Sequence, residues 1–380
     1  MLNHRPARRP LTLVAVAVLA ALTALASYAA AGTAAGDDRH RSGPDADAPL
    51  VIGHRGAPGY RPEHTLASYA LAARLGTDYV EPDLVSTKNG VLVARHEPEI
   101  SGTTDVAEHP QFADRRTTKS LDGADVTGWF TEDFTLAELK TLRAKERIPE
   151  LRPRNTLYDG RYEIPTFQEV IDLTRRLSRE LDRRIGLYPE TKHPTYFKRQ
   201  GLALERPLIK LLRRNGLDSP RAKVFVQSFE VANLRYLDRR LGVPLLELLD
   251  SPEVQPYDAV VRGDGITYGD LASDAGLDEV AGYADGIGPW KPYIVPRDAS
   301  EGSLEPTDFV DRAHRAGLEV HAYTFRNENS FLPSELRSGT DPALYGDAFS
   351  EYEQFFRLGV DGVFSDNPDT AVEARAGLYN

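Results

Sequence analysis

Short apolar segments recur along the chain with amphipathic helical patterns between them, and this alternation most limits the possible folds. Strands that alternate with helices pair in parallel, and eight of them close into a barrel with functional groups at the C-terminal strand ends. The predicted fold is therefore α/β, a TIM-like (β/α)8 barrel. The eight predicted strands are 50–53, 79–85, 185–189, 224–226, 244–248, 285–288, 319–324 and 362–365.

Helix starts and irregular stretches complete this outline. Thr135 with Glu138 and Thr166 with Glu169 have the spacing of a capping box, in which a hydroxyl and a carboxylate satisfy free backbone amides. Three stretches do not follow the alternation, and each comes after a strand end, so we expect each to cover the barrel mouth. They are 98–163, an insertion subdomain after a hairpin on the second strand, then 250–283 and 326–348.

The N-terminal 31 residues are predicted to be a signal peptide, with basic residues before an apolar run and small residues after it. The apolar run is shorter than the roughly 20 residues of a spanning helix, so no stable membrane anchor is expected. Arg8-Arg9 fits a twin-arginine route as well as general secretion. Residues 32–48 are predicted to be a disordered linker and 49–378 the barrel. We expect a protein that is secreted or lies at the cell-envelope exterior.

Composition excludes several classes of site and partner. The chain has no cysteine, so it can form neither a disulfide framework nor a thiolate zinc site. Removal of residues 1–31 deletes three arginines and no acid, which takes the formal net charge from −11 to −14. Nucleic acids and anionic membranes bind basic patches, so neither is an expected partner. A small-molecule partner is expected instead.

A tight turn determines the geometry of the second strand. Asn89-Gly90 stands between that strand and the apolar run that starts at Val91, and this pair is typical of a two-residue hairpin loop. If Lys88 pairs with Val91, His96 lies directly opposite Asp83. The sequence therefore predicts that an imidazole and a carboxylate are neighbours.

Carboxylates at strand ends predict a metal site. Glu81 and Asp83 are two residues apart on one strand, so they share a face, and Glu190 closes the next strand. Buried carboxylates without a cation raise each other's pKa, which favours a metal; carboxylates paired with arginine are the alternative. Oxygen ligands without cysteine suit Ca²⁺ or Mg²⁺ better than Zn²⁺. Lys192 is expected on the same side.

The first strand ends in His54-Arg55-Gly56. Glycine permits a close backbone approach, and the planar guanidinium matches phosphate oxygens in pairs; ordinary loop hydrogen bonds are the alternative interpretation. Together with His96, this gives two imidazoles beside a metal site, a set suited to cleaving a phosphodiester. The other histidines are not expected to be catalysts. Three of them are predicted in loops near the mouth, where they could contact substrate but are expected to have surface or supporting roles: His64, His109 and His193. His321 is predicted in the core, His314 on a helix and His40 in the linker.

The chain resembles the glycerophosphodiester phosphodiesterases, in particular their exported, periplasmic-type branch. The resemblance spans nearly the whole mature chain in order, including the insertion from Asp133 onward. Its motifs are His54-Arg55-Gly56, Pro62-Glu63-His64-Thr65, Glu81-Pro82-Asp83-Leu84, Thr87-Lys88-Asn89-Gly90, His96, Pro189-Glu190-Thr191-Lys192, Gln227-Ser228-Phe229 and the segment 359–366 that ends in Ser365-Asp366.

The resemblance implies a TIM-like barrel that hydrolyses glycerophosphodiesters to glycerol 3-phosphate and an alcohol with one divalent cation, Ca²⁺ being favoured over Mg²⁺. It also implies the roles of site residues: His54 and His96 as the general acid/base pair, Arg55 and Lys192 as phosphate ligands, Glu81, Asp83 and Glu190 as metal ligands, and Glu63 as a further metal candidate. Phe229 is a candidate apolar wall for the glycerol carbons. Many relatives have Asp where this chain has Glu97, which affects the partner that orients His96.

Two other functions compete with this one. The same barrel and metal could act on a glycerol-phosphate polymer such as teichoic acid, or on a lysophospholipid, and the export signal fits these substrates equally well. A secreted binding module without catalysis is the second competitor. Because both histidines and all three carboxylates are present, the sequence disfavours it.

Overall fold

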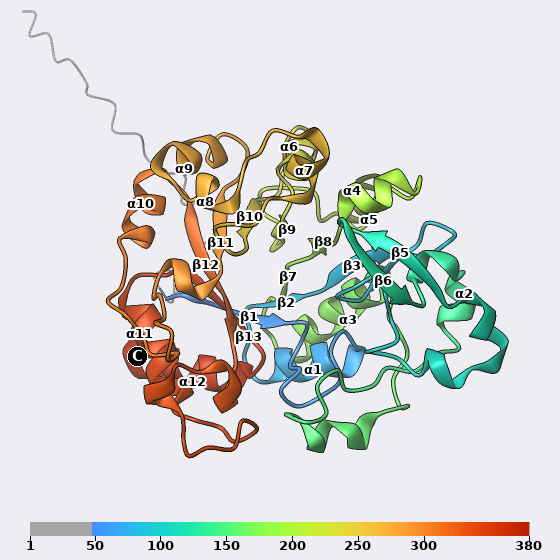
Figure 1. Ribbon diagram of the computed structural model, residues 1–380, viewed down its shortest axis with the longest axis horizontal. Helices are drawn as coiled ribbons and strands as arrows, with labels where there is room; N and C mark the ends of the chain where they lie inside the picture. The colour runs from blue at the N-terminus through green and yellow to red at the C-terminus, as the bar shows by residue number, and fades with distance from the viewer. Residues whose placement is uncertain (1–47, 380) are drawn as a thin grey trace, which may run out of the picture. The chain divides into compact units, whose positions relative to one another are not determined.

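The structure is a computed structural model that describes residues 48–379. The predicted signal peptide, nearly all of the predicted linker and His40 lie outside the described residues. The described part is a parallel barrel with helices around it (Figure 1). Its strands are β1 (Leu50–His54), β2 (Tyr79–Glu81) continued by β3 (Asp83–Ser86), β7 (Gly186–Leu187) continued by β8 (Glu190–Thr191), β9 (Val226–Ser228), β10 (Leu245–Leu249), β11 (Gly286–Pro289), β12 (Glu319–Phe325) and β13 (Gly362–Ser365).

Each strand pairs in parallel with the next, and β13 pairs with β1, which closes the barrel. The second and third strands are each interrupted at a proline, Pro82 and Pro189, because proline has no N–H to donate to a sheet. All eight predicted strands are present with ends within two residues of those expected. The predicted TIM-like barrel is therefore confirmed.

Helices cover the outside of the barrel, and both predicted capping boxes are formed, at Thr135 and Thr166. The α-helices are α1 (Leu66–Arg74), α2 (Leu136–Leu139), α3 (Phe167–Glu180), α4 (Pro194–Arg199), α5 (Glu205–Arg214), α6 (Val231–Asp238), α7 (Tyr257–Arg262), α8 (Tyr268–Leu271), α9 (Asp274–Val280), α10 (Phe309–Arg315), α11 (Ala348–Arg357) and α12 (Pro368–Tyr379). Within residues 48–379, no helix is both long and apolar enough to cross a membrane.

Aromatic side chains fill the interior of the barrel. Tyr188 stacks on Phe225 with ring centroids 4.9 Å apart, and Tyr79 packs edge-on against both rings. The Tyr188 hydroxyl lies 2.7 Å from Nδ1 of His321, which is fully buried, as predicted for a core histidine. This packed layer leaves only the C-terminal ends of the strands open for a site.

The hairpin after the second strand is present, but its predicted register is wrong by one residue. β3 pairs antiparallel with β4 (Leu92–Ala94), with Leu84 opposite Ala94. The backbone N–H of Arg95 donates to the carbonyl of Asp83 at 3.0 Å, so Arg95 lies opposite Asp83. His96 is therefore one residue beyond the predicted position, in the loop that follows β4.

The turn explains this shift. The Thr87 N–H donates to the Val91 carbonyl, which closes a three-residue loop instead of the expected two-residue loop. Only Gly90, with φ +74°, has a positive φ in this turn. Such loops combine a type I turn with one left-handed residue. Asn89 instead accepts the backbone N–H of Leu136 at the start of α2 with its side-chain oxygen.

The stretch 98–163 carries a second hairpin, β5 (Thr117–Leu121) and β6 (Ala124–Gly128), which lies beside α4 and β3 in Figure 1. The same stretch contains the 3₁₀ turns Val106–Glu108, Pro110–Arg115, Thr131–Asp133 and Pro153–Tyr158. The stretch 250–283 contains α7, α8 and α9, and 326–348 contains the 3₁₀ turns Asn329–Phe331 and Ser334–Leu336. A further 3₁₀ turn, Lys291–Tyr293, follows β11.

We predict that Gly90→Ala lowers the free energy of unfolding by about 1 kcal/mol, because alanine is strained in the left-handed region. Nothing lies within 4 Å of a Cβ added at Gly90, so the backbone conformation alone causes the loss. Gly102→Ala is the matched control, since it also meets nothing within 4 Å but has no positive φ. Denaturant unfolding measures both variants; equal stability would contradict the turn assignment.

Candidate active site

Strand register brings the predicted site residues to one edge of the barrel. His54 pairs with Glu81 between β1 and β2, and Asp83 pairs with Glu190 between β3 and β8. Glu190 also pairs with Gln227 on β9, and the Gln227 amide donates to Glu81 at 3.2 Å. Because parallel strands end at the same edge, residues distant in the sequence become neighbours there.

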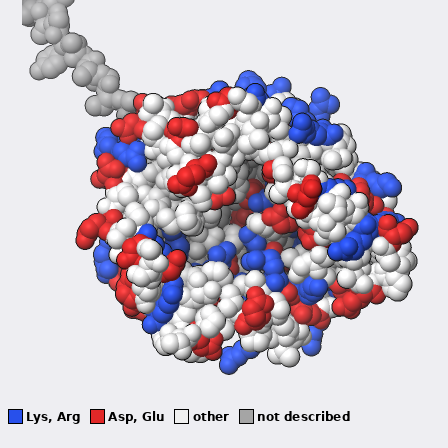
Figure 2. All heavy atoms as spheres, viewed as in Figure 1, with Lys and Arg blue, Asp and Glu red and all other residues white. Residues whose placement is uncertain are grey.

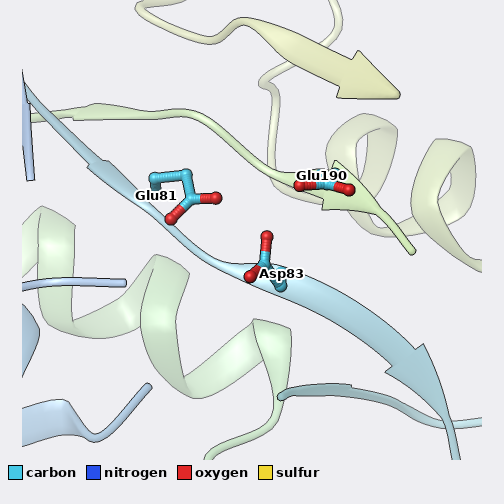
Figure 3. A group of neighbouring side chains, drawn as sticks. All are labelled: Glu81, Asp83 and Glu190. Atoms are coloured by element: carbon cyan, nitrogen blue, oxygen red, sulfur yellow. The ribbon is translucent and has the colours of Figure 1, made fainter. Parts of the chain in front are cut away.

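Three carboxylates converge at this edge. Glu81, Asp83 and Glu190 each offer an oxygen atom within 4.8 Å of the other two, and all three residues are buried. Figure 3 shows Glu81 and Asp83 on one strand run and Glu190 on the neighbouring one, with the carboxylates gathered between them. In the described part of the chain, Asp83 Oδ1 has no hydrogen-bond partner. A buried, unpaired carboxylate oxygen fits a cation ligand.

The carboxylates perturb one another electrostatically. Burial and the neighbouring Asp83 raise the pKa of Glu81 well above its usual value. Burial also raises the pKa of Glu190 to about 8, although Lys192 opposes this shift. A divalent cation would offset the repulsion, and a donor set of carboxylate oxygens suits Ca²⁺ or Mg²⁺. The group therefore fits a hard cation.

His54 is held at the mouth by a carboxylate at the end of the last strand. Its Nδ1 lies 2.6 Å from Asp366 Oδ1. The other oxygen of Asp366 accepts hydrogen bonds from Arg152 at 2.6 Å and Arg326 at 2.9 Å. Burial, together with the Arg55 guanidinium, lowers the pKa of His54 to about 4 despite the opposing charge of Asp366. Because ionised Asp366 accepts the proton of Nδ1, Nε2 is the free acceptor.

His96 has a different partner. Its Nδ1 lies 2.8 Å from Glu97 Oε1, and its Nε2 lies 3.4 Å from Lys192 Nζ. Burial and the charges of Arg55 and Lys192 lower the pKa of His96 to about 3. Glu97 is therefore the carboxylate that orients His96, the partner that the sequence had not settled.

The two predicted phosphate ligands lie beside the carboxylates. The Arg55 backbone N–H donates to Glu81 at 2.6 Å, and its Nε lies 3.6 Å from Asp83. Lys192 Nζ lies 3.1 Å from Glu190 and 5.4 Å from the centre of the Phe229 ring. Burial opposes the charge of Lys192, but Glu190 and the other acids raise its pKa above the usual value. Both side chains are therefore cations at neutral pH.

Glu63 lies outside the three-carboxylate group. Its Oε2 accepts hydrogen bonds from Arg55 at 3.1 Å and from Arg147 at 2.8 Å. Burial disfavours its charge, but these two guanidinium groups lower its pKa well below the usual value. Glu63 therefore positions Arg55 with its Oε2. Among the described residues its Oε1 is buried without a hydrogen-bond partner, and its assignment as a further metal candidate stays a prediction.

The remaining histidines have the supporting or surface positions expected. His64 Nε2 lies 2.9 Å from Asp83 Oδ2, and its Nδ1 lies 2.7 Å from the Tyr69 hydroxyl. His193 lies between two carboxylates. His109 and His314 form ion pairs with nearby aspartates away from the carboxylate group.

Three residues that support His54 received no role from the sequence. Asp366 directly follows β13, so the rule that site residues lie at the C-terminal strand ends could have identified it. Arg326 follows β12 in the same way. Arg152 comes from the insertion and had no sequence signal, because only the folded chain brings it to Asp366 and Glu328, with its Nε 2.6 Å from Glu328.

These groups line a cavity of about 730 Å³ that contains His54, His96 and the three carboxylates. Figure 2 shows this face hollowed at its centre, where acidic and basic side chains meet. The outer wall comes from segments 251–253, 290–301 and 330–331. Among the described residues, none of 98–163 lines the cavity, so the insertion does not cover it as expected. The loop after β11 takes that place.

A closed parallel barrel with acids, imidazoles and cations at its strand ends defines a TIM-barrel enzyme. Residues 54–370 match the glycerophosphoryl diester phosphodiesterase family, and the chain belongs to that family. This confirms the resemblance found in the sequence.

Named relatives agree with this assignment. Glycerophosphodiester phosphodiesterase GDPD6 of Arabidopsis thaliana is 39% identical, with 84% of this chain and 83% of that protein covered. The glycerophosphodiester phosphodiesterase of Haemophilus influenzae is 30% identical, covering 87% and 90%. A phosphodiesterase structure from Oleispira antarctica has the same fold, with a TM-score of 0.55, 20% identity and coverage of 86% and 96%.

We predict that Ca²⁺ added after chelation raises the melting temperature, because a cation that binds only the folded state stabilises it by about 3 kcal/mol at 100 times its Kd. Glu190→Gln should lose most of this gain. Glu253→Gln, an exposed acid at the cavity rim, is the matched control and should keep it. Thermal unfolding with and without Ca²⁺ measures the effect; the same gain in Glu190→Gln would contradict the site.

Proposed function

We propose that this enzyme hydrolyses glycerophosphodiesters to sn-glycerol 3-phosphate and an alcohol, with His54 and His96 as general acid and base. One observation carries the proposal: two neutral imidazoles, a guanidinium, an ammonium and three carboxylates line the same cavity. Family membership supports the substrate class, and the structure from Oleispira antarctica contains sn-glycerol 3-phosphate as product. The predicted N-terminal signal supports a second proposal, that the enzyme acts outside the cytoplasm.

Glu81, Asp83 and Glu190 would hold one divalent cation. We propose Ca²⁺ over Mg²⁺, because Ca²⁺ accepts several carboxylate ligands in flexible geometry whereas Mg²⁺ usually takes one or two. When bound, the cation would polarise a phosphoryl oxygen and offset its charge.

The protein's own residues bind the phosphate and transfer protons. Arg55 and Lys192, both held as cations, bind the phosphate oxygens. Each catalytic histidine is neutral at neutral pH and has its Nδ1 next to a carboxylate, so Nε2 can take a proton. One histidine takes the proton of a glycerol hydroxyl that attacks phosphorus. The other first binds a proton from solvent at its Nε2, which the negative charge of the bound phosphodiester favours, and then gives that proton to the departing alcohol. The resulting cyclic glycerol phosphate is opened by water.

The histidine roles predict a clear pattern among variants. His54→Ala and His96→Ala should each lower kcat by roughly 10²-fold or more, the scale of a lost acid or base. His109→Ala, an ion-paired histidine away from the cavity, should keep near wild-type kcat. Circular dichroism confirms folding. Activity of His96→Ala near the wild-type level would sink the acid/base assignment.

A substrate panel tests the reaction itself. Glycerophosphocholine and glycerophosphoethanolamine should be cleaved at comparable rates, because recognition depends on the phosphate and the glycerol hydroxyls. Bis(p-nitrophenyl) phosphate should be a poor substrate because it has no glycerol hydroxyl. Activity should disappear after chelation and return with Ca²⁺. Equal cleavage of bis(p-nitrophenyl) phosphate would exclude internal attack, and preference for a glycerol-phosphate polymer would change the substrate class.

A further inference from the structure

A row of alternating carboxylates and imidazoles links His96 to the insertion. Glu97 Oε1 lies 2.8 Å from His96, and Glu97 Oε2 lies 2.9 Å from His193 Nε2. His193 Nδ1 in turn lies 2.5 Å from Asp122 Oδ2. These four side chains come from the loop after β4, the loop between β8 and α4, and the turn of the β5–β6 hairpin. They form one continuous hydrogen-bonded chain, called here the His96 relay.

The chemistry of the relay determines where its protons lie. Both ring nitrogens of His193 face carboxylates, which can only accept, so His193 must donate from both and carry a positive charge. Burial opposes this charge, but Asp122 and Glu97 raise the pKa of His193 to about 9. Glu97 therefore stays ionised between two imidazoles. Ionised Glu97 accepts the Nδ1 proton of His96, which leaves His96 Nε2 as a proton acceptor in the cavity.

Backbone conformation positions both residues of the Asp122–His193 contact, the outer contact of the relay. Asp122 and Gly123 have φ of +48° and +88°, the conformation of a type I′ turn, which presents Asp122 at the hairpin tip. His193 also has a positive φ, +48°, immediately before Pro194 at the start of α4. Asp-Gly is a preferred pair for such a turn, so Asp122 adopts its conformation locally, whereas His193 is held in its conformation by its surroundings. The turn therefore sets the position of Asp122, and the loop before α4 sets that of His193.

We propose that Asp122 and His193 are positioning residues for His96, and that the insertion acts on the reaction through this relay, although it does not line the cavity. The inference rests on the proposed role of His96. In this arrangement the hairpin tip keeps Glu97 aimed at Nδ1 of His96. Loss of the tip contact frees Glu97 to turn, so the hydrogen bond at Nδ1 of His96 weakens and the ring is held less firmly toward the cavity.

Asp122→Asn tests the outer contact with little change in shape. We expect kcat to fall by about 10-fold, as for other supporting partners of site histidines, while KM stays near the wild-type value. Asp125→Asn is the matched control, because Asp125 is exposed on β6 of the same hairpin and outside the relay. Equal kcat values for the two variants would overturn the proposal.

A double-mutant cycle makes the test independent of folding effects at the hairpin. Glu97→Gln cuts the relay next to His96, so adding Asp122→Asn to it should cost no further activity. An additional 10-fold loss in the double variant would mean that Asp122 acts by another route, which would overturn the relay.

Nitrogen-15 NMR of the labelled full-length chain gives a readout besides activity. His96, assigned through His96→Ala, should carry its proton on Nδ1 in the wild type, and the Nδ1 chemical shift should move in Asp122→Asn as the hydrogen bond to Glu97 weakens. An unchanged His96 signal in Asp122→Asn, with His96→Ala inactive, would overturn the relay alone. An active His96→Ala would instead refute the proposed acid/base role, whatever the relay does.

Discussion

The burial of three carboxylates at neighbouring strand ends is the constraint on which the rest of the site depends. Glu81, Asp83 and Glu190 repel one another in a poorly solvated position, so each must be offset by a cation or a donor. Arg55 and Lys192 supply fixed positive charge, yet one oxygen of Asp83 stays unpaired. Burial lowers the pKa of His96, and the same charges that stabilise the acids lower it further and keep the ring neutral. The charges of the buried acids and the protonation of His96 thus depend on one electrostatic balance.

The site also depends on an unusual backbone conformation at several of its residues. Arg55, His64 and His193 all have positive φ values, which cost side-chain-bearing residues free energy. Gly56 follows Arg55 with a φ of +96°, and a Cβ there would lie 2.5 Å from the Ser68 hydroxyl. The dense hydrogen bonding around these residues holds the conformations in place. The backbone conformation therefore orients the side chains of the site as much as their hydrogen-bond partners do.

The sequence alone determined the barrel, its eight strands and the three carboxylates. Alternation of apolar strands with helices is a local signal, and parallel strands always end at one edge, so His54, Glu81 and Glu190 could be brought together without coordinates. The two-residue period of a strand likewise placed Asp83 with Glu81. These inferences succeed because they depend on short-range periodicity, which the chain carries wherever it folds.

Only the tertiary structure decided the partners that cross between elements. The hairpin register differs by one residue from the prediction, and the Asn89 side chain is bound to the start of α2, an interaction outside the turn itself. Arg152 reaches Asp366 across 214 residues of sequence, and Asp122 meets His193 across 71. Such contacts have no periodic signal in the sequence, because whether a charged pair forms depends on which loops the completed barrel brings together. The sequence therefore determines the barrel and its three carboxylates, whereas the tertiary structure decides which residues hold each histidine.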